Sequence, residues 1–407
     1  MPEAVIVDAI RTPIGRAVKG TLKDIRADDL AAVVLRALVD RNPGVDFSQT
    51  DDVMMGCGFP DHEQGYNIGR NALLLSGIDH HVPAVTVSRF CASSLQTIRM
   101  AFHAIKAGEG DAFISAGVEC VSRFGKGSSD SWPDTKNPVF AAAEERTAGQ
   151  AKGGGEVWHD PRQDDDIPDV YLAMGQTAEN VAKLRGISRG EQDEFGVRSQ
   201  NLAEKALAGG FWQRDITPAT LPDGTVVSAD DGPRAGTTLE KVSTLQPVFR
   251  PDGTVTAGNC CPLNDGAAAV VVMSDRKAAQ LGLTPLARIV ASGVSALSPE
   301  IMGLGPVEAS RRALAHAGMT IEDIDLVEIN EAFAAQVIPS YRELGIDVDK
   351  LNVNGGAIAV GHPFGMTGAR ITSTILNSLA FHDKTFGLET MCVGGGQGMA
   401  MIFERLS

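Results

Sequence analysis

Two kinds of apolar pattern alternate along the chain. Short runs rich in Val, Ile and Ala predict buried strands, and stretches with apolar residues every three or four positions predict amphipathic helices. In the first third of the chain, strands are predicted at residues 5–9, 52–55, 85–87 and 112–116, and helices at residues 28–40 and 93–107. This alternation is typical of an α/β protein whose strands lie under helices.

The same order of elements recurs in the last third of the chain. A helix, a turn, a short acidic segment and a strand occur at residues 28–56 and again at residues 307–330. Pairing Asp52 with Asp325, or Phe113 with Phe386, gives an offset of 273 residues, and pairing Cys91 with His362 gives 271. A nearly constant offset over three segments predicts two similarly folded halves related by a pseudo-twofold axis.

The repeat is absent between residues 121 and 248, where polar, turn-rich stretches surround two predicted helices at 175–184 and 189–208. We expect this part to be inserted into the first half, which resumes before the apolar strand 267–274. The predicted domains are residues 1–120 with 249–275, an inserted loop domain at 121–248, and residues 276–407. An insertion of this size suits a lid or a cofactor-recognition unit.

Composition and charge exclude several classes of protein. The formal net charge is −15, from 36 basic and 51 acidic residues, whereas a nucleic-acid-binding protein needs a basic face. The longest apolar runs, such as residues 267–273, are too short to cross a bilayer. The first eight residues lack the features of a signal or transit peptide, and the last three, Arg-Leu-Ser, are not the peroxisomal Ser-Lys-Leu signal. We therefore expect a cytoplasmic protein.

Cys91 is the first candidate for chemistry. The six cysteines form neither a CxxC pair nor a Cys/His zinc spacing, so we expect free thiols and no metal site. Cys91 lies between a predicted strand and a predicted helix, where the helix dipole is expected to lower the thiol pKa and make the sulfur a better nucleophile. The alternative is a buried structural cysteine.

Three further candidates follow predicted strands or interrupt glycine-rich segments. His362 lies among five glycines at residues 355–368, although an isolated histidine is more often a core or surface residue. Cys392 ends a predicted strand and precedes three glycines, where the amide of Gly394 would be free to donate to an oxyanion. Asn330 follows another predicted strand, and its commoner role there would be a helix N-cap.

One motif is misleading. Residues 186–190, Gly-Ile-Ser-Arg-Gly, match the serine-hydrolase pattern, but they follow a helix rather than a strand. Ser188 with Glu191 three residues later indicates a capping box instead.

Several blocks together resemble the thiolase family. They are the Cys91 block, NEAF at 330–333, GGAIAVGHPFGMTGAR at 355–370, CVGGGQG at 392–398, TAGNCCPLNDGAAA at 256–269 and MGQTAENVA at 174–182. The resemblance covers essentially the whole chain. It implies an α/β fold with five layers, α-β-α-β-α, made of two pseudosymmetric halves with a loop domain inserted in the first.

The resemblance also implies roles for the candidate residues. Cys91 would be the nucleophile that becomes acylated, with His362 as its general base and Cys392 as the acid/base on the acetyl α-carbon. Asn330, through a water, and His362 would line one oxyanion site, and the amides of Cys91 and Gly394 would form the other.

Coenzyme A would be a substrate, with no tightly bound cofactor. The positions that match the family place Arg234 near the nucleotide and Met174, Phe249 and Phe333 along the pantetheine channel. Cys261 stands where a serine would contact pantetheine. Two other departures are Ala173, where acetoacetyl-CoA-type enzymes have a histidine, and Ser94, where a glycine usually follows the nucleophile by three residues. Loss of that histidine leaves room for longer acyl chains.

The expected activity is therefore CoA-dependent cleavage of 3-oxoacyl-CoA in fatty-acid β-oxidation. The alternatives are a biosynthetic enzyme that forms acetoacetyl-CoA, a decarboxylating ketoacyl synthase, and a catalytically silent acyl-CoA or sterol carrier. A second cysteine at 392 argues against the synthase, and the intact Cys91, His362 and Cys392 argue against the carrier. The resemblance further implies a homodimer or homotetramer, with complexes with other β-oxidation enzymes as further expected partners.

Overall fold

The computed structural model describes residues 1–126 and 135–407, so residues 127–134 of the predicted inserted domain lie outside the description. The predicted helices at 93–107 and 189–208 are confirmed as α3 (Ser93–Ala107) and α6 (Arg189–Ala208). The helices predicted at 28–40 and 175–184 are each one residue longer at both ends, as α1 (Ala27–Arg41) and α5 (Met174–Arg185). The other long helices are α2 (Ile68–Ser76), α4 (Ala141–Gln150), α9 (Gly305–Ala317), α10 (Ala334–Leu344) and α12 (Thr367–Phe381).

Nine strands form one continuous order, β10-β11-β12-β9-β1-β8-β5-β3-β4, to which the short β2 (Gly15–Arg16) adds by pairing with β8. The first half contributes β1 (Ala4–Arg11), β3 (Asp52–Cys57), β4 (Ala84–Val87), β5 (Ala112–Cys120) and β8 (Asn264–Ser274). The second half contributes β9 (Ala287–Ala296), β10 (Leu326–Ile329), β11 (Phe386–Val393) and β12 (Gln397–Arg405). Only two residue pairs of β1 and β9 join the two halves of the sheet.

The pairing of the strands repeats between the halves. In the first half β3 is parallel to β5, β5 is antiparallel to β8, and β8 is antiparallel to β1. In the second half β10 is parallel to β11, β11 is antiparallel to β12, and β12 is antiparallel to β9. In the first half, β4 runs parallel to β3. At the equivalent place in the second half, a single parallel bridge joins Val327 of β10 to Leu351. The predicted repeat of two halves is therefore confirmed.

The structure corrects the register of that repeat to 274 residues. Asp51, not Asp52, corresponds to Asp325, because each uses Oδ2 to accept the amides of two residues at the start of the neighbouring strand. Helices α3 and α12 also begin 274 residues apart, at Ser93 and Thr367. His362 therefore lies three residues before the position equivalent to Cys91. The two are not exact counterparts, because more residues separate His362 from its helix.

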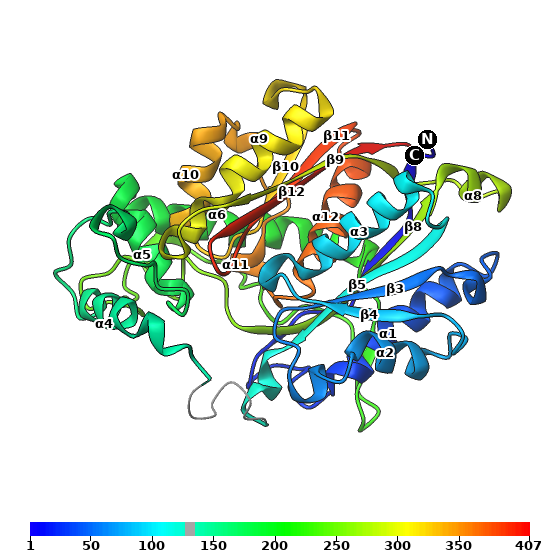
Figure 1. Cartoon of the computed structure of the whole chain (residues 1–407), viewed down its shortest axis with the longest axis horizontal. Helices are drawn as coiled ribbons and strands as arrows, with labels where there is room; N and C mark the ends of the chain where they lie inside the picture. Colours follow the sequence, from blue (N-terminus) through cyan, green and yellow to red (C-terminus); the bar gives the residue numbers. More distant parts are fainter. Residues whose placement is uncertain (127–134) are drawn as a thin grey trace.

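Three hydrophobic clusters define five layers (Figure 1). Helices α1 and α2 share one cluster with the outer face of the first half-sheet, and α9 and α10 share another with the outer face of the second. Helices α3 and α12 share the third with strands of both half-sheets. The order is thus helix, sheet, helix, sheet, helix, which confirms the predicted five-layered fold.

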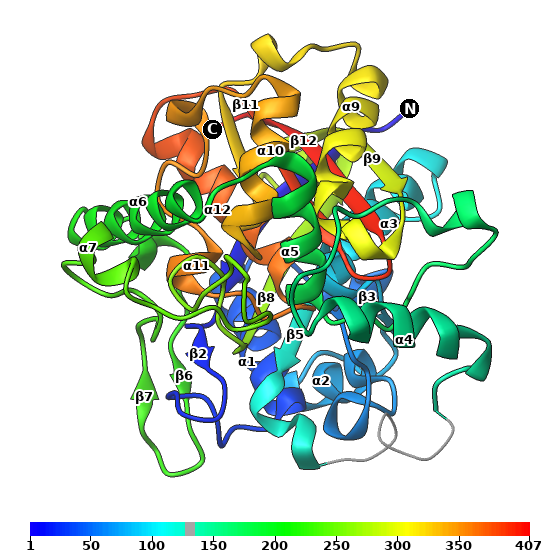
Figure 2. The same cartoon turned by 90° about the vertical axis from the view of Figure 1, so that its left-hand side faces the viewer.

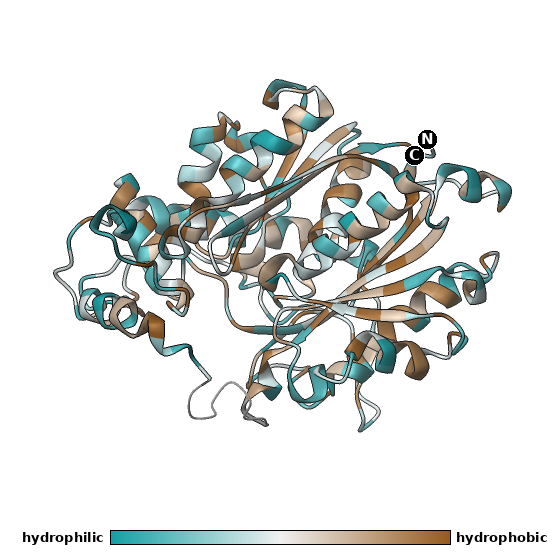
Figure 3. Ribbon diagram, viewed as in Figure 1, coloured by the Kyte–Doolittle hydropathy of each residue, from teal (hydrophilic) through white to brown (hydrophobic). Residues whose placement is uncertain are grey.

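Strand β8 shows how the sequence produces these layers. Side chains alternate between the two faces of a strand, and here Ala267, Ala269 and Val271 belong to the outer cluster, whereas Val270 and Val272 belong to the central one. Because both faces are buried, the strand is apolar at every one of these positions. The strands are accordingly hydrophobic along much of their length, and polar positions concentrate on the outer helices (Figure 3).

The two central helices approach each other closely where both begin. A Cβ on Gly368 would overlap the backbone nitrogen of Leu95, so only glycine fits this crossing. Next to it, the Ala369 amide donates to Ser94 Oγ at 2.9 Å, which satisfies one of the free amides in the first turn of α12.

The segment between β5 and β8 contains α4, α5, α6, the short α7 (Leu239–Val242) and the small hairpin of β6 (Ala219–Thr220) and β7 (Val226–Val227). Helices α4 and α5 lie at the end of the molecule opposite the two chain termini (Figure 1), and Figure 2 views the molecule from the side of this segment. The domain limits given above stay a prediction. Among the described residues, no helix is both long and apolar enough to cross a membrane.

Replacing Gly368 by alanine tests the central helix crossing. We expect the free energy of unfolding to fall by about 2 to 3 kcal/mol, because the added methyl group meets rigid backbone, and this cost exceeds the gain in helix propensity of about 1 kcal/mol. Urea unfolding of Gly368→Ala beside Gly44→Ala would measure the effect. Gly44 is exposed with no atom within 4 Å of an added Cβ, so its variant should stay within about 0.5 kcal/mol of the parent. Equal stabilities of the two variants would contradict the crossing.

Candidate active site

Cys91 lies in a tight turn between β4 and α3. The turn is a 3-10 helix, Phe90–Ala92, and Phe90 has a φ of 43°, a left-handed conformation that is uncommon for a bulky residue. Ser93 stabilises it, since its hydroxyl accepts the Arg89 amide at 2.9 Å and donates to the Phe90 carbonyl at 2.6 Å. A strained conformation held by its surroundings is frequent at functional sites.

His362 is held by hydrogen bonds on both its backbone and its ring. Its amide donates to Asn264 Oδ1 at 2.9 Å, and its Nδ1 lies 2.6 Å from Thr367 Oγ1. The Thr367 hydroxyl donates its one hydrogen to the Pro363 carbonyl at 2.7 Å, so it can only accept from the ring. This geometry places the imidazole proton on Nδ1 and leaves the Nε2 lone pair available as a base.

The Asn330 side chain lies near both ring nitrogens of His362, with its Nδ2 3.5 Å from Nδ1. Its Nδ2 lies 3.3 Å from His362 Nε2, and its Oδ1 is buried with no hydrogen-bond partner among the described residues. The Asn330 amide donates to the Thr390 carbonyl on β11, two residues before Cys392. Helix α10 begins only at Ala334, so the N-cap alternative for Asn330 is wrong. Its side-chain amide faces the imidazole instead.

Cys392 and Gly394 lie beside Cys91. Cys392 is fully buried in β11, and the Cys91 thiol is close enough to raise its pKa. The backbone amides of Gly394 and of Cys91 itself are close enough to the Cys91 sulfur to act against the rise in its pKa. Phe90 packs on the same turn, because a Cβ on Gly394 would be 3.2 Å from its ring. Two thiols and two backbone donors therefore meet at one point.

Burial determines the protonation states of Cys91, His362 and Cys392. It raises the pKa of the Cys91 thiol to about 11, against which the two backbone amides act only in part, so the expectation of a lowered thiol pKa is wrong. Burial, followed by the positive charge of Arg370, lowers the pKa of His362 to about 3. Burial also raises the pKa of Cys392 well above its ordinary value. At neutral pH both thiols and the imidazole are thus uncharged.

A buried carboxylate links the segments around the site. Glu119, at the end of β5, accepts the amides of Gly58 at 2.7 Å and Gly365 at 2.8 Å and the side chain of Gln64 at 2.7 Å. It thereby fixes the loop after β3 against the glycine-rich segment of His362. Glu119 and Thr367 were not among the residues predicted from the sequence. For Glu119, the available signal was an acidic residue within an otherwise buried strand.

Four of the five predicted CoA-binding residues surround Cys392 in one apolar cluster. Within it, the rings of Phe249 and Phe333 are 6.1 Å apart in an edge-on arrangement. The predicted members are Met174, Phe249, Cys261 and Phe333. Cys261 also lines a cavity of about 150 Å³ with the fifth residue, Arg234, which is exposed. The cluster next to the thiols thus continues, through Cys261, toward a surface cation.

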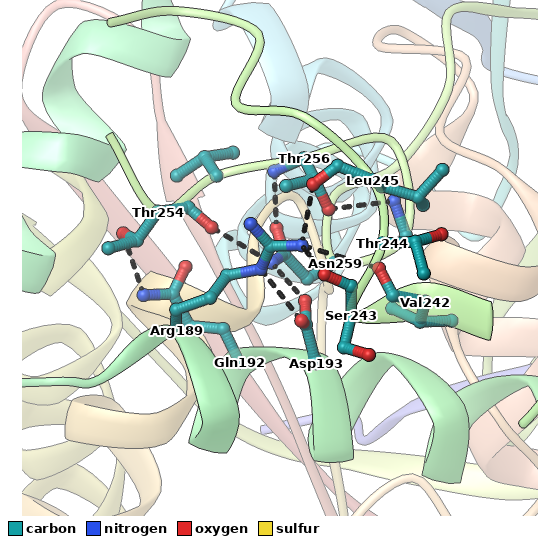
Figure 4. A network of polar contacts seen from close by, with 12 residues as sticks. Arg189, Gln192, Asp193, Val242, Ser243, Thr244, Leu245, Thr254, Thr256 and Asn259 are labelled. Carbon is teal, nitrogen blue, oxygen red and sulfur yellow. Dashed lines mark hydrogen bonds and ion pairs between the residues drawn. The ribbon is translucent and has the colours of Figure 1, made fainter. Parts of the chain in front are cut away.

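A polar network braces the loop that carries Cys261 (Figure 4). On α6, Asp193 accepts from Arg189 at 2.7 Å and from Asn259 Nδ2 at 2.8 Å. The Asn259 carbonyl accepts the first amide of α10, from Ala334, and the Cys261 amide donates to the Ala332 carbonyl. The segment between β5 and β8 therefore positions the loop of Cys261 directly against the segment that follows Asn330.

The remaining sequence features also have clear positions. The Ser94 side chain points to the start of α12, as its bond to the Ala369 amide shows. Ala173 is exposed and precedes α5. Ser188 and Glu191 form the predicted capping box of α6, so the serine-hydrolase pattern carries no nucleophile.

Comparisons with known proteins identify the family of the chain. Residues 4–276 match the family model described as thiolase, N-terminal domain, and residues 283–405 match thiolase, C-terminal domain. The chain belongs to the thiolase family. It is 45% identical to a 3-ketoacyl-CoA thiolase of Pseudoalteromonas translucida and 43% identical to a β-ketoadipyl-CoA thiolase of Acinetobacter baylyi, in each case over 100% of both chains. The dimeric peroxisomal thiolase of Saccharomyces cerevisiae matches with a TM-score of 0.88 and 35% identity, over 99% of this chain and 98% of that one.

The hydrogen bond between Thr367 and His362 predicts a kinetic effect in this thiolase. In Thr367→Val the ring N–H loses its acceptor, which costs about 1 to 3 kcal/mol for a buried group, so kcat should fall about tenfold or more while KM for CoA stays within about twofold. Thr367→Ser should restore kcat to within about threefold.

Thr374→Val is the matched control. Thr374 is a buried threonine on the same helix whose hydroxyl donates only to the Arg370 carbonyl, at 3.0 Å. Steady-state assays of the three variants would compare these effects. Equal losses of kcat in Thr367→Val and Thr374→Val would show that the hydroxyl of Thr367 does not orient the base.

Proposed function

We propose that this thiolase cleaves 3-oxoacyl-CoA with CoA into acetyl-CoA and a shortened acyl-CoA, through an acyl-cysteine on Cys91. The observation that carries the proposal is the position of the Cys91 sulfur, which lies near the backbone amide of Gly394 and beside a second buried thiol, that of Cys392. Such an arrangement stabilises negative charge on an oxygen held at the nucleophile and supplies a proton carrier for a neighbouring carbon. The name of the P. translucida relative, 3-ketoacyl-CoA thiolase, supports this substrate class.

In the first step Cys91 attacks the ketone carbon of the substrate. Because the thiol is neutral at rest, its proton moves to His362 Nε2 as the sulfur–carbon bond forms, and Thr367 holds the ring in the tautomer that can accept it. The developing alkoxide is stabilised by hydrogen-bond donors of the centre, for which we assign His362 with Asn330, and the amides of Cys91 and Gly394.

In the second step the alkoxide collapses and breaks the bond between the ketone carbon and the α-carbon. The electron pair leaves with the acetyl-CoA fragment as an enolate, which takes a proton from Cys392. The raised pKa of Cys392 keeps this thiol protonated, as an acid must be. CoA then enters, and its sulfur bonds to the acyl carbon as its proton passes to the Cys392 thiolate. Cys91 leaves as the bond between its sulfur and the acyl carbon breaks, and it regains its proton from His362.

The setting of this reaction is also a proposal. We assign it to fatty-acid β-oxidation in the cytoplasm, with CoA thioesters as substrates, and other β-oxidation enzymes as partners. A homodimer or homotetramer is proposed because the S. cerevisiae thiolase is dimeric and because β4 is an edge strand of the sheet, with all four residues half-buried. The half-exposed Leu74 and Leu75 of the adjacent α2 add apolar area there.

Removing the nucleophile tests the proposal directly. In Cys91→Ala we expect kcat/KM for acetoacetyl-CoA thiolysis to fall by about 10⁴-fold or more, and acetyl-CoA should leave no adduct on the intact protein. Cys120→Ala is the matched control, since Cys120 is also a buried thiol but lies on β5 outside the centre. An acyl adduct on Cys91→Ala by mass spectrometry would move the nucleophile elsewhere, and inactive wild-type protein would favour a silent carrier.

Removing the second thiol should separate the two steps. In Cys392→Ala, acylation by acetyl-CoA should stay within about threefold of wild type, because Cys91 and His362 are intact. Condensation of two acetyl units should fall by about 10² to 10⁴-fold, the usual contribution of a positioned acid/base. Rapid-quench labelling measures the first rate, and acetoacetyl-CoA formation measures the second. Unchanged condensation would assign the carbon proton to another group.

A further inference from the structure

Two adjacent histidines and an aspartate lie together in the loop between α2 and β4, at one edge of the sheet (Figure 1). The three residues, Asp79, His80 and His81, are named here the loop triad. The Nδ1 atoms of both imidazoles are close to the same carboxylate oxygen, Asp79 Oδ1, at 2.8 Å for His81 and 3.6 Å for His80. The two rings also lie against each other, with centroids 4.1 Å apart.

The spacing of the donor atoms in the loop triad fits a metal ion. One donor atom from each residue lies within 4.8 Å of the other two. Donor atoms on a tetrahedral ion with bonds of about 2.1 Å are about 3.4 Å apart, which falls between the two distances measured at Asp79 Oδ1. Among the residues that the structure describes, no other group of three histidine, cysteine or carboxylate side chains comes this close together.

The donor types favour a transition-metal ion. Imidazole nitrogen binds Zn²⁺, Ni²⁺ and Cu²⁺, whereas Mg²⁺ and Ca²⁺ take oxygen ligands. The carboxylate is ready to bind, because the amide of His81, followed by the histidine side chains, lowers the pKa of Asp79 below its usual value and keeps it ionised at neutral pH. In the described part of the chain its ion pairs are with the two histidines alone, so no lysine or arginine competes for it.

Hydrogen bonds hold the backbone of the loop in place. Arg70 on α2 donates to the His80 carbonyl at 2.6 Å and to the Val82 carbonyl at 2.5 Å. The Val82 amide donates to the Asp79 carbonyl at 3.0 Å, and the His81 amide donates to Asp79 Oδ1 at 2.9 Å. Since the loop is already ordered, little conformational entropy is lost when an ion binds.

The loop triad is open to solvent and separate from the proposed catalytic centre. The side chains of His80 and His81 are 71% and 79% exposed, so an ion can enter without movement of the core. The loop comes directly before β4, whereas Cys91 follows that strand. An ion bound here would therefore take no part in the reaction at Cys91.

We infer that the loop triad binds one divalent transition-metal ion of the zinc class, with Asp79 and both histidines as ligands and water at the remaining position. The ion fixes the loop that leads into the edge strand β4. The sequence-based expectation of no metal site came from the spacing of the cysteines, which carries no information on a site made of histidines and a carboxylate. The inference is independent of the proposed function.

Calorimetric titration of the metal-free full chain with Zn²⁺ tests this inference. Wild type should show a step of one ion per chain that saturates below about 0.1 mM Zn²⁺, and about a tenfold excess of Mg²⁺ should not displace the ion. Because loss of a mere second-shell partner weakens metal binding 10- to 100-fold, His80→Ala and His81→Ala should each weaken the step by about tenfold or more. Asp79→Asn, which can still accept the His81 amide, should weaken it through loss of the charge.

His159→Ala is the matched control. His159 is also an exposed histidine beside a carboxylate, with its Nε2 2.6 Å from Asp164 Oδ2, but it has no third donor nearby among the described residues. Its variant should bind Zn²⁺ as wild type does. All of these side chains are exposed, so the variants should keep the wild-type melting temperature without metal, and the thiols are the same in each.

Three results would overturn the inference. The first is a wild-type titration with no saturable step below about 0.1 mM Zn²⁺. The second is unchanged binding in the double variant of His80→Ala and His81→Ala, which would place the ion elsewhere, for example on the thiols. The third is an equal loss in His159→Ala and His81→Ala, which would mean adventitious binding to surface histidines only. None of these results changes the expected thiolysis by Cys91.

Discussion

The close crossing of α3 and α12 is the constraint on which the site depends. Cys91 lies in the turn just before α3, and His362 lies in the loop just before α12, so the contact between the helix starts sets where these two groups stand. Gly368 against Leu95 and Ser94 against the Ala369 amide define that contact within narrow limits. Because the two half-sheets are joined by only two residue pairs of β1 and β9, the central helices carry much of the connection between the halves. The same few residues therefore hold the two halves together and fix the positions of Cys91 and His362.

Exclusion of water from this contact then sets the chemistry. A cysteine and a histidine in water would differ by only about two pKa units, but burial raises one to about 11 and lowers the other to about 3. A stable ion pair is thus disfavoured at rest, and charge develops only when substrate supplies an oxygen that the donors can stabilise. Since Cys392 is kept neutral by the same burial, one physical cause keeps Cys91, His362 and Cys392 uncharged together.

Much of the fold followed from the sequence because its signals are local and repeated. The apolar runs and helical spacing marked elements such as α3 and α6, and a nearly constant offset revealed the two halves. The true register of 274 did not follow, because it is fixed by the amides that Asp51 and Asp325 accept, which only paired strands display. The site residues came from motifs and a family resemblance, which carry no information on burial, so the direction of the Cys91 pKa was missed. Glu119 and Thr367 were missed because their partners are remote in sequence or depend on the exact path of a loop.

Two separate sets of hydrogen bonds brace the loops around the candidate centre. Next to Cys392, Asp193 and Asn259 brace the loop of Cys261 against the loop that follows Asn330. Next to His362, the loop after β3 and the glycine-rich loop meet through Glu119, which accepts amides from both. Because the two sets share no residue, a substitution in one can leave the other in place, provided that Glu119 keeps its two loops in register.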